Sequence, residues 1–176
     1  MRKVVLTFGL IAGAILSAMM LLTLPFQDQI GFDKGAVIGY TTMVLAFMMV
    51  FFGVKSYRDN VAGGSVTFGR ALKVGLLITA VTTVCYVATW EVVYYKLAPD
   101  FIEKYSAHAI EKAKKSGATD AQIAVQTKQM AKFAEMYKNP LVNIALTSLE
   151  PLPVGILFVL VTAGVLSRKR RAAVAA

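Results

Sequence analysis

Four long runs of apolar residues, separated by charged stretches, dominate this sequence of 176 residues. A helix needs about 20 apolar residues to cross the ~30 Å hydrocarbon layer of a bilayer. We therefore predict transmembrane helices over about 4–24, 36–54, 71–95 and 141–166. Helices are expected because an isolated strand cannot satisfy its backbone hydrogen bonds in lipid. The expected fold class is all-α, a four-helix membrane bundle forming one domain over 1–176.

The composition agrees with a membrane protein and argues against a nucleic-acid-binding one. Charged residues make up only 16% of the chain, whereas a soluble domain carries about 25%. The formal net charge is +9, but the basic residues do not form a folded basic face with stacking aromatics. The single cysteine, Cys85, excludes an internal disulfide. We expect the lipid bilayer as the main surroundings, no nucleic acid and no cofactor.

The first apolar run follows Arg2 and Lys3, as the core of a secretory signal peptide would. The run continues to Leu24, however, and such a core is typically only about 7–15 residues long. We therefore expect an uncleaved first span.

The arginines indicate the orientation. The segments 1–3, 55–73 and 167–176 hold 10 of the 19 lysines and arginines, including all six arginines: Arg2, Arg58, Arg70, Arg168, Arg170 and Arg171. Because basic residues accumulate in cytoplasmic loops, we predict both termini in the cytoplasm and a location in the bacterial inner membrane. The opposite segment, 96–138, carries eight lysines, but it is long and also holds five acidic residues.

The segment 96–138 has a helical pattern of its own. Ser116-Gly117 ends a first helix, and Thr119 with Gln122 fits a capping box at the start of a second. The two apolar stripes are Phe101, Tyr105 and Ala109, then Ile123, Met130, Phe133 or Ala134, and Tyr137, with a polar gap at Gln126 or Thr127. We predict an extracytoplasmic amphipathic hairpin that lies on the bundle or on the lipid headgroups.

Small residues recur at four-residue spacing in two places, a pattern that lets helix backbones approach closely. The first set is Gly9, Gly13 and Ser17, and the second is Gly31, Gly35 and Gly39. We interpret both as packing surfaces within the bundle, with a homo-oligomer interface as the alternative.

Two carboxylates lie inside predicted spans, and ionisable residues there are functional candidates by default. Glu91 follows Lys73 by 18 residues, and Glu150 precedes Arg168 by 18 residues. At a rise of about 1.5 Å per residue, both lie ~27 Å from the inner basic residues and so at similar depth. Glu91 has aromatic neighbours typical of a membrane interface, Trp90, Tyr94 and Tyr95.

Glu150 is followed by Pro151 and Pro153, and each proline removes a helix hydrogen bond. We predict a kink or break there that frees the carbonyls of Thr147 and Leu149. Glu91, Glu150 and the hydroxyls of Thr147 and Ser148 then form a candidate site for a proton or a cation. In the alternative interpretation Pro151 merely begins the fourth helix, with Glu150 complementing its N-terminus.

The remaining candidates are weaker. Lys55, Arg58, Arg70 and Lys73 could contact anionic lipid headgroups, although basic residues at this boundary also simply set topology. His108, the only histidine, is predicted on a solvated face without a second metal ligand, so we expect no metal site. The sequence shows no catalytic serine motif, zinc-ligand spacing or phosphate-binding loop, and we expect no catalytic residues.

Several strings together resemble the bacterial membrane family catalogued as domain of unknown function 4199. The resemblance covers about residues 4–168 and is most specific at Lys55-Ser56-Tyr57-Arg58-Asp59, which Gly63-Gly64 follows. The other matching strings are Gly9 to Gly13, Gly39-Tyr40, Phe68 to Gly75, Tyr86 to Trp90, Asp100-Phe101 and Glu150-Pro151. The resemblance implies a four-span membrane protein and no particular activity.

These observations favour a non-enzymatic structural, accessory or partner-binding membrane protein, which could also be a homo-oligomer. The alternative is a small proton- or cation-coupled transporter that uses its intramembrane carboxylates. Spans one and two offer few polar residues, which argues against a wide pore.

Overall fold

The computed structural model describes residues 1–167, and the basic cluster predicted to stop the fourth span, Arg168-Lys169-Arg170-Arg171, lies outside them. The fold is all-α, with 87% of residues in helices and no strand in the described part. In chain order the elements are α1 (Arg2–Thr23), η1 (Leu24–Phe26), α2 (Gln27–Ile30), α3 (Phe32–Asn60), α4 (Phe68–Val92), η2 (Val93–Leu97), α5 (Phe101–Lys115), α6 (Asp120–Tyr137), α7 (Pro140–Ser148) and α8 (Pro151–Leu166).

Four helical stretches of residues 1–167 are long and apolar enough to cross a membrane: Arg2–Ile30, Phe32–Asn60, Phe68–Leu97 and Pro140–Leu166. Their mean hydropathies lie between 1.8 and 2.3. Each stretch contains one predicted run, so the number and order of the spans are confirmed. The chain has the architecture of a four-span membrane protein.

Helix α1 ends at Thr23, next to the predicted end of the first span at about residue 24, but the chain does not leave its helical path there. Pro25 instead lies in the first turn of the 3-10 helix η1, where a proline's missing N–H would have no partner anyway. The chain then continues through α2 and turns only at Gly31, whose φ of 74° favours glycine. The predicted loop 25–35 is therefore almost entirely helical.

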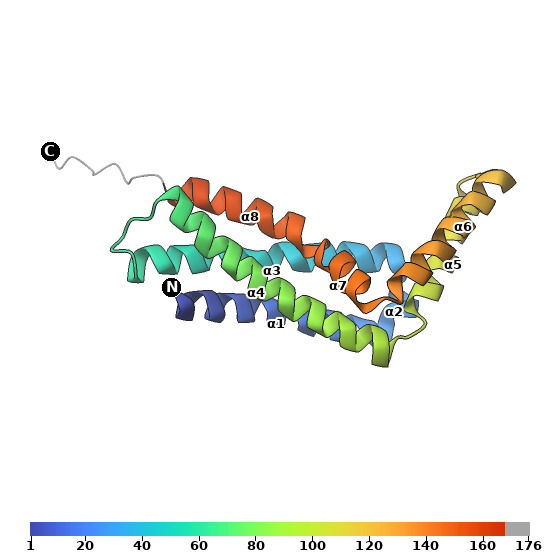
Figure 1. Ribbon diagram of the computed structural model, residues 1–176, viewed down its shortest axis with the longest axis horizontal. Helices are drawn as coiled ribbons and strands as arrows, with labels where there is room; N and C mark the ends of the chain where they lie inside the picture. The colour runs from blue at the N-terminus through green and yellow to red at the C-terminus, as the bar shows by residue number, and fades with distance from the viewer. Residues whose placement is uncertain (168–176) are drawn as a thin grey trace.

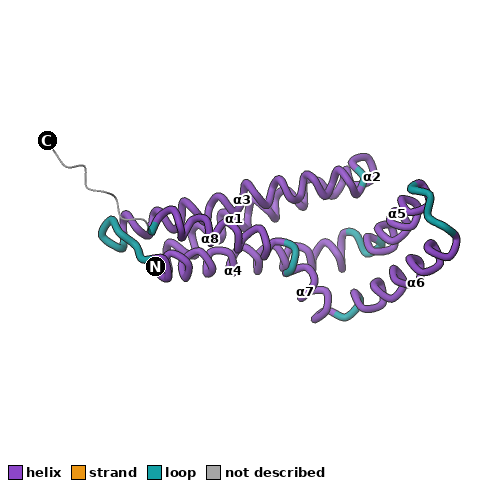
Figure 2. The backbone as a smooth tube through the Cα atoms, turned by 90° about the horizontal axis from the view of Figure 1, so that it is seen from above, coloured by secondary structure: helices purple, strands orange, loops and turns teal. Residues whose placement is uncertain are grey.

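The spans form a bundle in which α1 and α8 each pack against both α3 and α4 (Figure 1). The N-terminus, the α3–α4 connection and the end of α8 lie together at one end of the molecule, and α5 and α6 project from the other (Figures 1 and 2). This hairpin lies at the end opposite Arg2, Arg58 and Arg70.

The sequence signals for both connections are confirmed. In the short α3–α4 connection Gly63 and Gly64 have φ of 68° and 88°, and Thr67 caps α4 by accepting a 3.4 Å hydrogen bond from the Arg70 amide. In the hairpin Thr119 and Gln122 form the predicted capping box. Gln126, at the polar gap in the stripe, donates a 3.2 Å hydrogen bond to the Ala109 carbonyl and so joins α6 to α5.

The fourth span is interrupted where the prolines indicated, between α7 and α8. The interruption is mild, because Leu149 and Glu150 keep helical dihedrals and Pro151 begins α8. The Thr147 carbonyl is not free, as we had expected, because it accepts a 3.3 Å hydrogen bond from the Glu150 amide. A tightened i→i+3 turn thus replaces the bond that Pro151 removes.

Candidate functional site

The two halves of the bundle are packed differently. The half next to the termini, which we call the closed half, has a continuous apolar core of fully buried side chains: Phe47, Val50, Val54, Val74, Ile78 and Val159. The half next to the hairpin, which we call the open half, contains a partly open cavity of about 710 Å³. That volume falls in the range of small-molecule sites, about 300–1,000 Å³.

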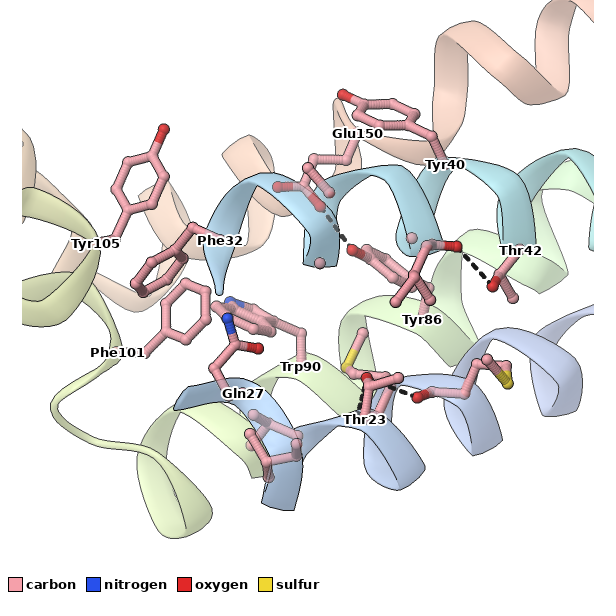
Figure 3. Close-up of a pocket in the computed structure, with 18 of the residues that line it drawn as sticks. Thr23, Gln27, Phe32, Tyr40, Thr42, Tyr86, Trp90, Phe101, Tyr105 and Glu150 are labelled. Carbon is pink, nitrogen blue, oxygen red and sulfur yellow. Dashed lines mark hydrogen bonds between the residues drawn. The ribbon is translucent and has the colours of Figure 1, made fainter. Parts of the chain in front are cut away.

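The cavity lies where α1, α2, the start of α3 and the end of α4 meet the hairpin and α7 (Figure 3). Its walls are mostly apolar and aromatic, with Tyr40, Tyr86 and Trp90 from the spans and Phe101 and Tyr105 from the hairpin. The hairpin therefore forms part of the wall and is more than a connection between the last two spans.

Glu150 lines this cavity and is itself exposed. Tyr86 donates a 2.6 Å hydrogen bond to Glu150 Oε2, a length typical of a hydroxyl bound to an ionised carboxylate. Tyr40 lies beside the same carboxyl group (Figure 3). Among the described residues that line the cavity, Glu150 is the only charged one.

A directed chain of hydrogen bonds runs beside the cavity. Trp90 Nε1 donates to Tyr137 Oη at 2.8 Å, and Tyr137 Oη lies 3.0 Å from Thr147 Oγ1. Thr147 itself donates to Asn143 Oδ1 at 3.1 Å, so Tyr137 must donate to Thr147, since a hydroxyl has one hydrogen. Burial raises the pKa of Tyr137, which keeps this phenol protonated as a donor. The chain joins α4, the end of α6 and α7 around one wall of the site.

The structure separates the predicted group Glu91, Glu150, Thr147 and Ser148. Glu150 faces the cavity and Thr147 belongs to the hydrogen-bond chain, whereas Ser148 donates to the Ile144 carbonyl on its own helix. Glu91 does not line the cavity, and its Oε1 is buried without a partner among the described residues.

The two carboxylates point in different directions. Glu91 follows Tyr86 by five residues, which rotates it about 140° around α4 at 3.6 residues per turn. Tyr86 and Trp90 face the cavity together, and Glu91 points elsewhere.

The two stripes of small residues have different roles. A Cβ on Gly9 would lie 2.7 Å from Val81 Cβ, a Cβ on Gly13 would lie 2.5 Å from Cys85 Cβ, and Ser17 Oγ lies 2.7 Å from Thr89 Oγ1. This stripe is therefore a close contact between α1 and α4. Gly35 and Gly39 line the cavity instead, and no atom lies within 4 Å of where a Gly39 Cβ would be.

Phe32 anchors the hairpin to the start of α3. Its ring lies 5.5 Å from that of Phe101, 5.6 Å from that of Tyr105 and 5.2 Å from that of His108. Two ion pairs support the contact, Lys112 with Asp33 at 2.6 Å and Lys104 with Asp28 at 3.6 Å. His108 is therefore not simply solvated, as we had predicted, because it packs against Phe32 and lies 3.6 Å from Asp33.

The basic candidates lie at the opposite end of the bundle. Lys55, Arg70 and Lys73 are exposed there, and Arg58 forms a 2.7 Å ion pair with Asp59. Within residues 1–167 no group of three or more metal-ligating side chains is placed to hold a metal ion. Sequence reasoning missed Tyr86 and Phe32, although the Tyr86–Trp90 spacing of four residues indicates one shared helix face.

The family model described as "Protein of unknown function (DUF4199)" matches residues 7–168. The chain belongs to this family. No curated protein and no solved structure matches it. Membership confirms the resemblance seen in the sequence and accounts for almost all of the chain, including Glu150 and the aromatic residues around it. The family description names no activity, so the function has to be argued from the cavity of this DUF4199 protein.

Proposed function

We propose that this chain is a non-enzymatic protein of the bacterial inner membrane that binds an amphiphilic molecule in the cavity of its open half. The observation that carries the proposal is the cavity itself, about 710 Å³ within a span-forming bundle. Its apolar and aromatic walls suit the body of such a ligand, while Tyr86 and Glu150 offer polar contacts for its head.

The lining chemistry supports a binding role over catalysis. Among the described residues that line the cavity there is no serine, cysteine, histidine or lysine, the usual nucleophiles and bases of enzymes. The same site could take an apolar segment of a membrane-protein partner in place of a small molecule. A second copy of this chain is a further candidate partner.

The arginines support an orientation with both termini in the cytoplasm. Arg2, Arg58 and Arg70 lie at the end of the bundle opposite the hairpin. In this orientation the hairpin and the cavity lie toward the extracytoplasmic side, and a ligand enters from the outer leaflet or from outside the cell. Cysteine accessibility at Ser116 and Asn60 in intact cells tests the orientation, with Ser116→Cys expected to react with a membrane-impermeant maleimide.

Trp90 makes the cavity directly observable, because it is the chain's only tryptophan and lines the site. In phosphatidylglycerol proteoliposomes, 12-bromododecanol should quench Trp90 in a saturable manner. Gly39→Leu fills the cavity and should abolish the saturable part. The matched control is Gly164→Leu, which meets equally open space on α8 outside the cavity and should bind normally. Quenching that rises linearly and equally in all three proteins would contradict the proposal.

One observation favours the alternative of a proton- or cation-coupled transporter, namely the Glu150 carboxylate within the cavity. Transport also requires a path through the closed half, where Phe47, Val50, Val54 and Ile78 are fully buried and apolar. A transporter predicts ion-driven uptake into proteoliposomes that Glu150→Gln abolishes, whereas a binding protein predicts saturable binding without flux.

A further inference from the structure

The ligand of this cavity carries a positive charge: we infer that the open half binds a lipophilic cation, an ammonium group on an apolar body, with Glu150 as its counter-ion. The inference rests on the proposed function and names the chemical class of its ligand. It starts from an imbalance of charge in the cavity, where Glu150 is the only charged lining residue and no lysine, arginine or histidine of the described chain lines the wall.

Glu150 is exposed within the bundle, but it lies in a candidate span, where an ionised carboxylate is costly unless it is paired. A carboxylate offers about four acceptor positions, and the described chain supplies Glu150 with one donor, the Tyr86 hydroxyl at 2.6 Å. The remaining acceptor positions are available to a ligand. A cation that reaches this carboxylate supplies the charge that the protein itself does not provide.

The aromatic residues near Glu150 strengthen the argument for an organic cation. Tyr86 contacts the carboxyl group and Tyr40 lines the same cavity, while Trp90 lies one helical turn further along α4 (Figure 3). Aromatic faces attract ammonium groups within about 6 Å, and quaternary ammonium ligands are typically held in aromatic cages. A bare metal ion would gain little from these rings, and it would need more oxygen ligands than Glu150 provides.

The apolar part of the wall selects a ligand with a hydrocarbon body. Met19, Met20, Met43 and Leu146 line the same cavity, and methionines adapt to apolar groups of irregular shape. A phospholipid headgroup fits less well, because its phosphate would lie near Glu150 with no basic residue on the wall to neutralise it. We therefore assign the site to a free lipophilic amine or quaternary ammonium compound, and not to phosphatidylethanolamine.

The test compares three probes that share a brominated dodecyl chain and differ in the head: trimethylammonium, alcohol and sulfate. Quenching of Trp90 in proteoliposomes of phosphatidylglycerol gives each dissociation constant. We expect the ammonium probe to bind at least about tenfold more tightly than the alcohol, and the sulfate most weakly. Glu150→Gln should bring the ratio of ammonium to alcohol affinities close to one.

The matched control is Glu91→Gln, which removes a carboxylate of similar depth that does not line the cavity. It should retain the full preference for the ammonium probe. Saturable alcohol binding without an ammonium preference in the wild-type protein would overturn the inference and leave the proposed function intact. The absence of saturable binding by any probe would overturn both. Because phosphatidylglycerol itself concentrates a cationic probe at the vesicle surface, each dissociation constant is expressed per probe partitioned into protein-free vesicles of the same lipid. On that scale the wild-type comparison is decisive, whether or not Glu150→Gln folds.

A further arm distinguishes the two sources of an ammonium group. Half of the phosphatidylglycerol is replaced by phosphatidylethanolamine, and the ammonium probe is titrated again. The affinity of the wild-type protein, relative to that of Glu150→Gln in the same vesicles, should not change. A severalfold loss confined to the wild-type protein would show that a lipid headgroup fills the site, and would overturn the assignment to a free cation.

Discussion

The two stripes of small residues in this bundle have the same spacing but pack differently. Between α1 and α4, Gly9 and Gly13 face Val81 and Cys85, and the backbones approach until a Cβ would not fit. In the open half Gly39 meets no atom within 4 Å of where its Cβ would be, and it lines the cavity. Small residues at four-residue spacing therefore permit close approach without causing it.

The difference follows from the residues opposite each stripe. Val81, Cys85 and Thr89 are small and recur at the same four-residue spacing as the α1 stripe, so the two surfaces match along their length. Bulky aromatic side chains occupy the open half, including Tyr86, Trp90 and Phe101. These rings line the cavity, and the mild interruption before Pro151 separates the part of the fourth span near the cavity from α8.

The largest effect should come from adding one methyl group to the contact between α1 and α4. Gly13→Ala places a Cβ 2.5 Å from Cys85 Cβ, and such overpacking costs about 1–3 kcal/mol. Gly39→Ala, in open space, should be neutral or slightly stabilising, because alanine favours helix over glycine. Equilibrium unfolding in mixed SDS micelles measures both. Equal destabilisation by the two variants would remove the distinction between the two stripes.

A smaller effect on the stability of the bundle is expected where the hairpin joins the open half. Phe32→Ala removes three ring contacts, and the loss is confined to the docking of the hairpin, which can open locally while the bundle stays folded. The hairpin should then detach more often, and trypsin should cleave its lysines several times faster. Phe52→Ala is the control, because Phe52 is exposed on α3 and its ring contact is with the neighbouring Phe51. Unchanged cleavage in Phe32→Ala would mean that the ion pairs alone hold the hairpin.

Removal of one hydroxyl tests the wall of the cavity. Tyr137→Phe leaves the Trp90 indole N–H without its partner and removes the donor to Thr147. The expected cost is about 1 kcal/mol, with a blue shift of Trp90 emission. The control is Tyr95→Phe, which changes an exposed tyrosine. This variant should leave the emission of Trp90 unchanged. An identical shift in both variants would argue against the hydrogen-bond chain.

The smallest effect concerns the pH dependence of the hairpin. Lys115 lowers the pKa of Glu111 below its usual value of 4.5, and Lys104 lowers that of Asp100 below 3.8. Because folding lowers these pKa values, each ion pair stabilises the hairpin fully when the pH is above the carboxyl group's pKa in the unfolded chain. The stabilisation is lost as the pH falls through the carboxyl group's pKa in the folded protein. Glu111→Gln should therefore slightly lower the thermal unfolding temperature at pH 7. The difference should disappear at pH 3.

Much of the architecture could be predicted because it depends on local pattern. Each apolar run is long enough to span a bilayer, Thr119 and Gln122 satisfy each other's backbone amides, and Pro151 cannot continue the hydrogen bonding of a helix. The helical path continues beyond the predicted end of the first span for a reason that is also local. A proline in the first turn of a new helical segment does not end the helical path.

The candidate site depended on information that the sequence does not contain. The sequence by itself determined that Glu91 and Glu150 lie inside spans and at similar depth, because helical rise converts residue number into distance along the membrane normal. The tertiary structure decided which carboxylate faces the cavity, because that depends on how α4 and the fourth span are rotated against their neighbours. It gave Glu150 the Tyr86 hydroxyl as a partner and turned Glu91 away from the cavity. The Tyr86–Glu150 hydrogen bond joins residues that are 64 positions apart in the sequence. Packing between helices sets such a contact, and the periodicity of one helix cannot specify it.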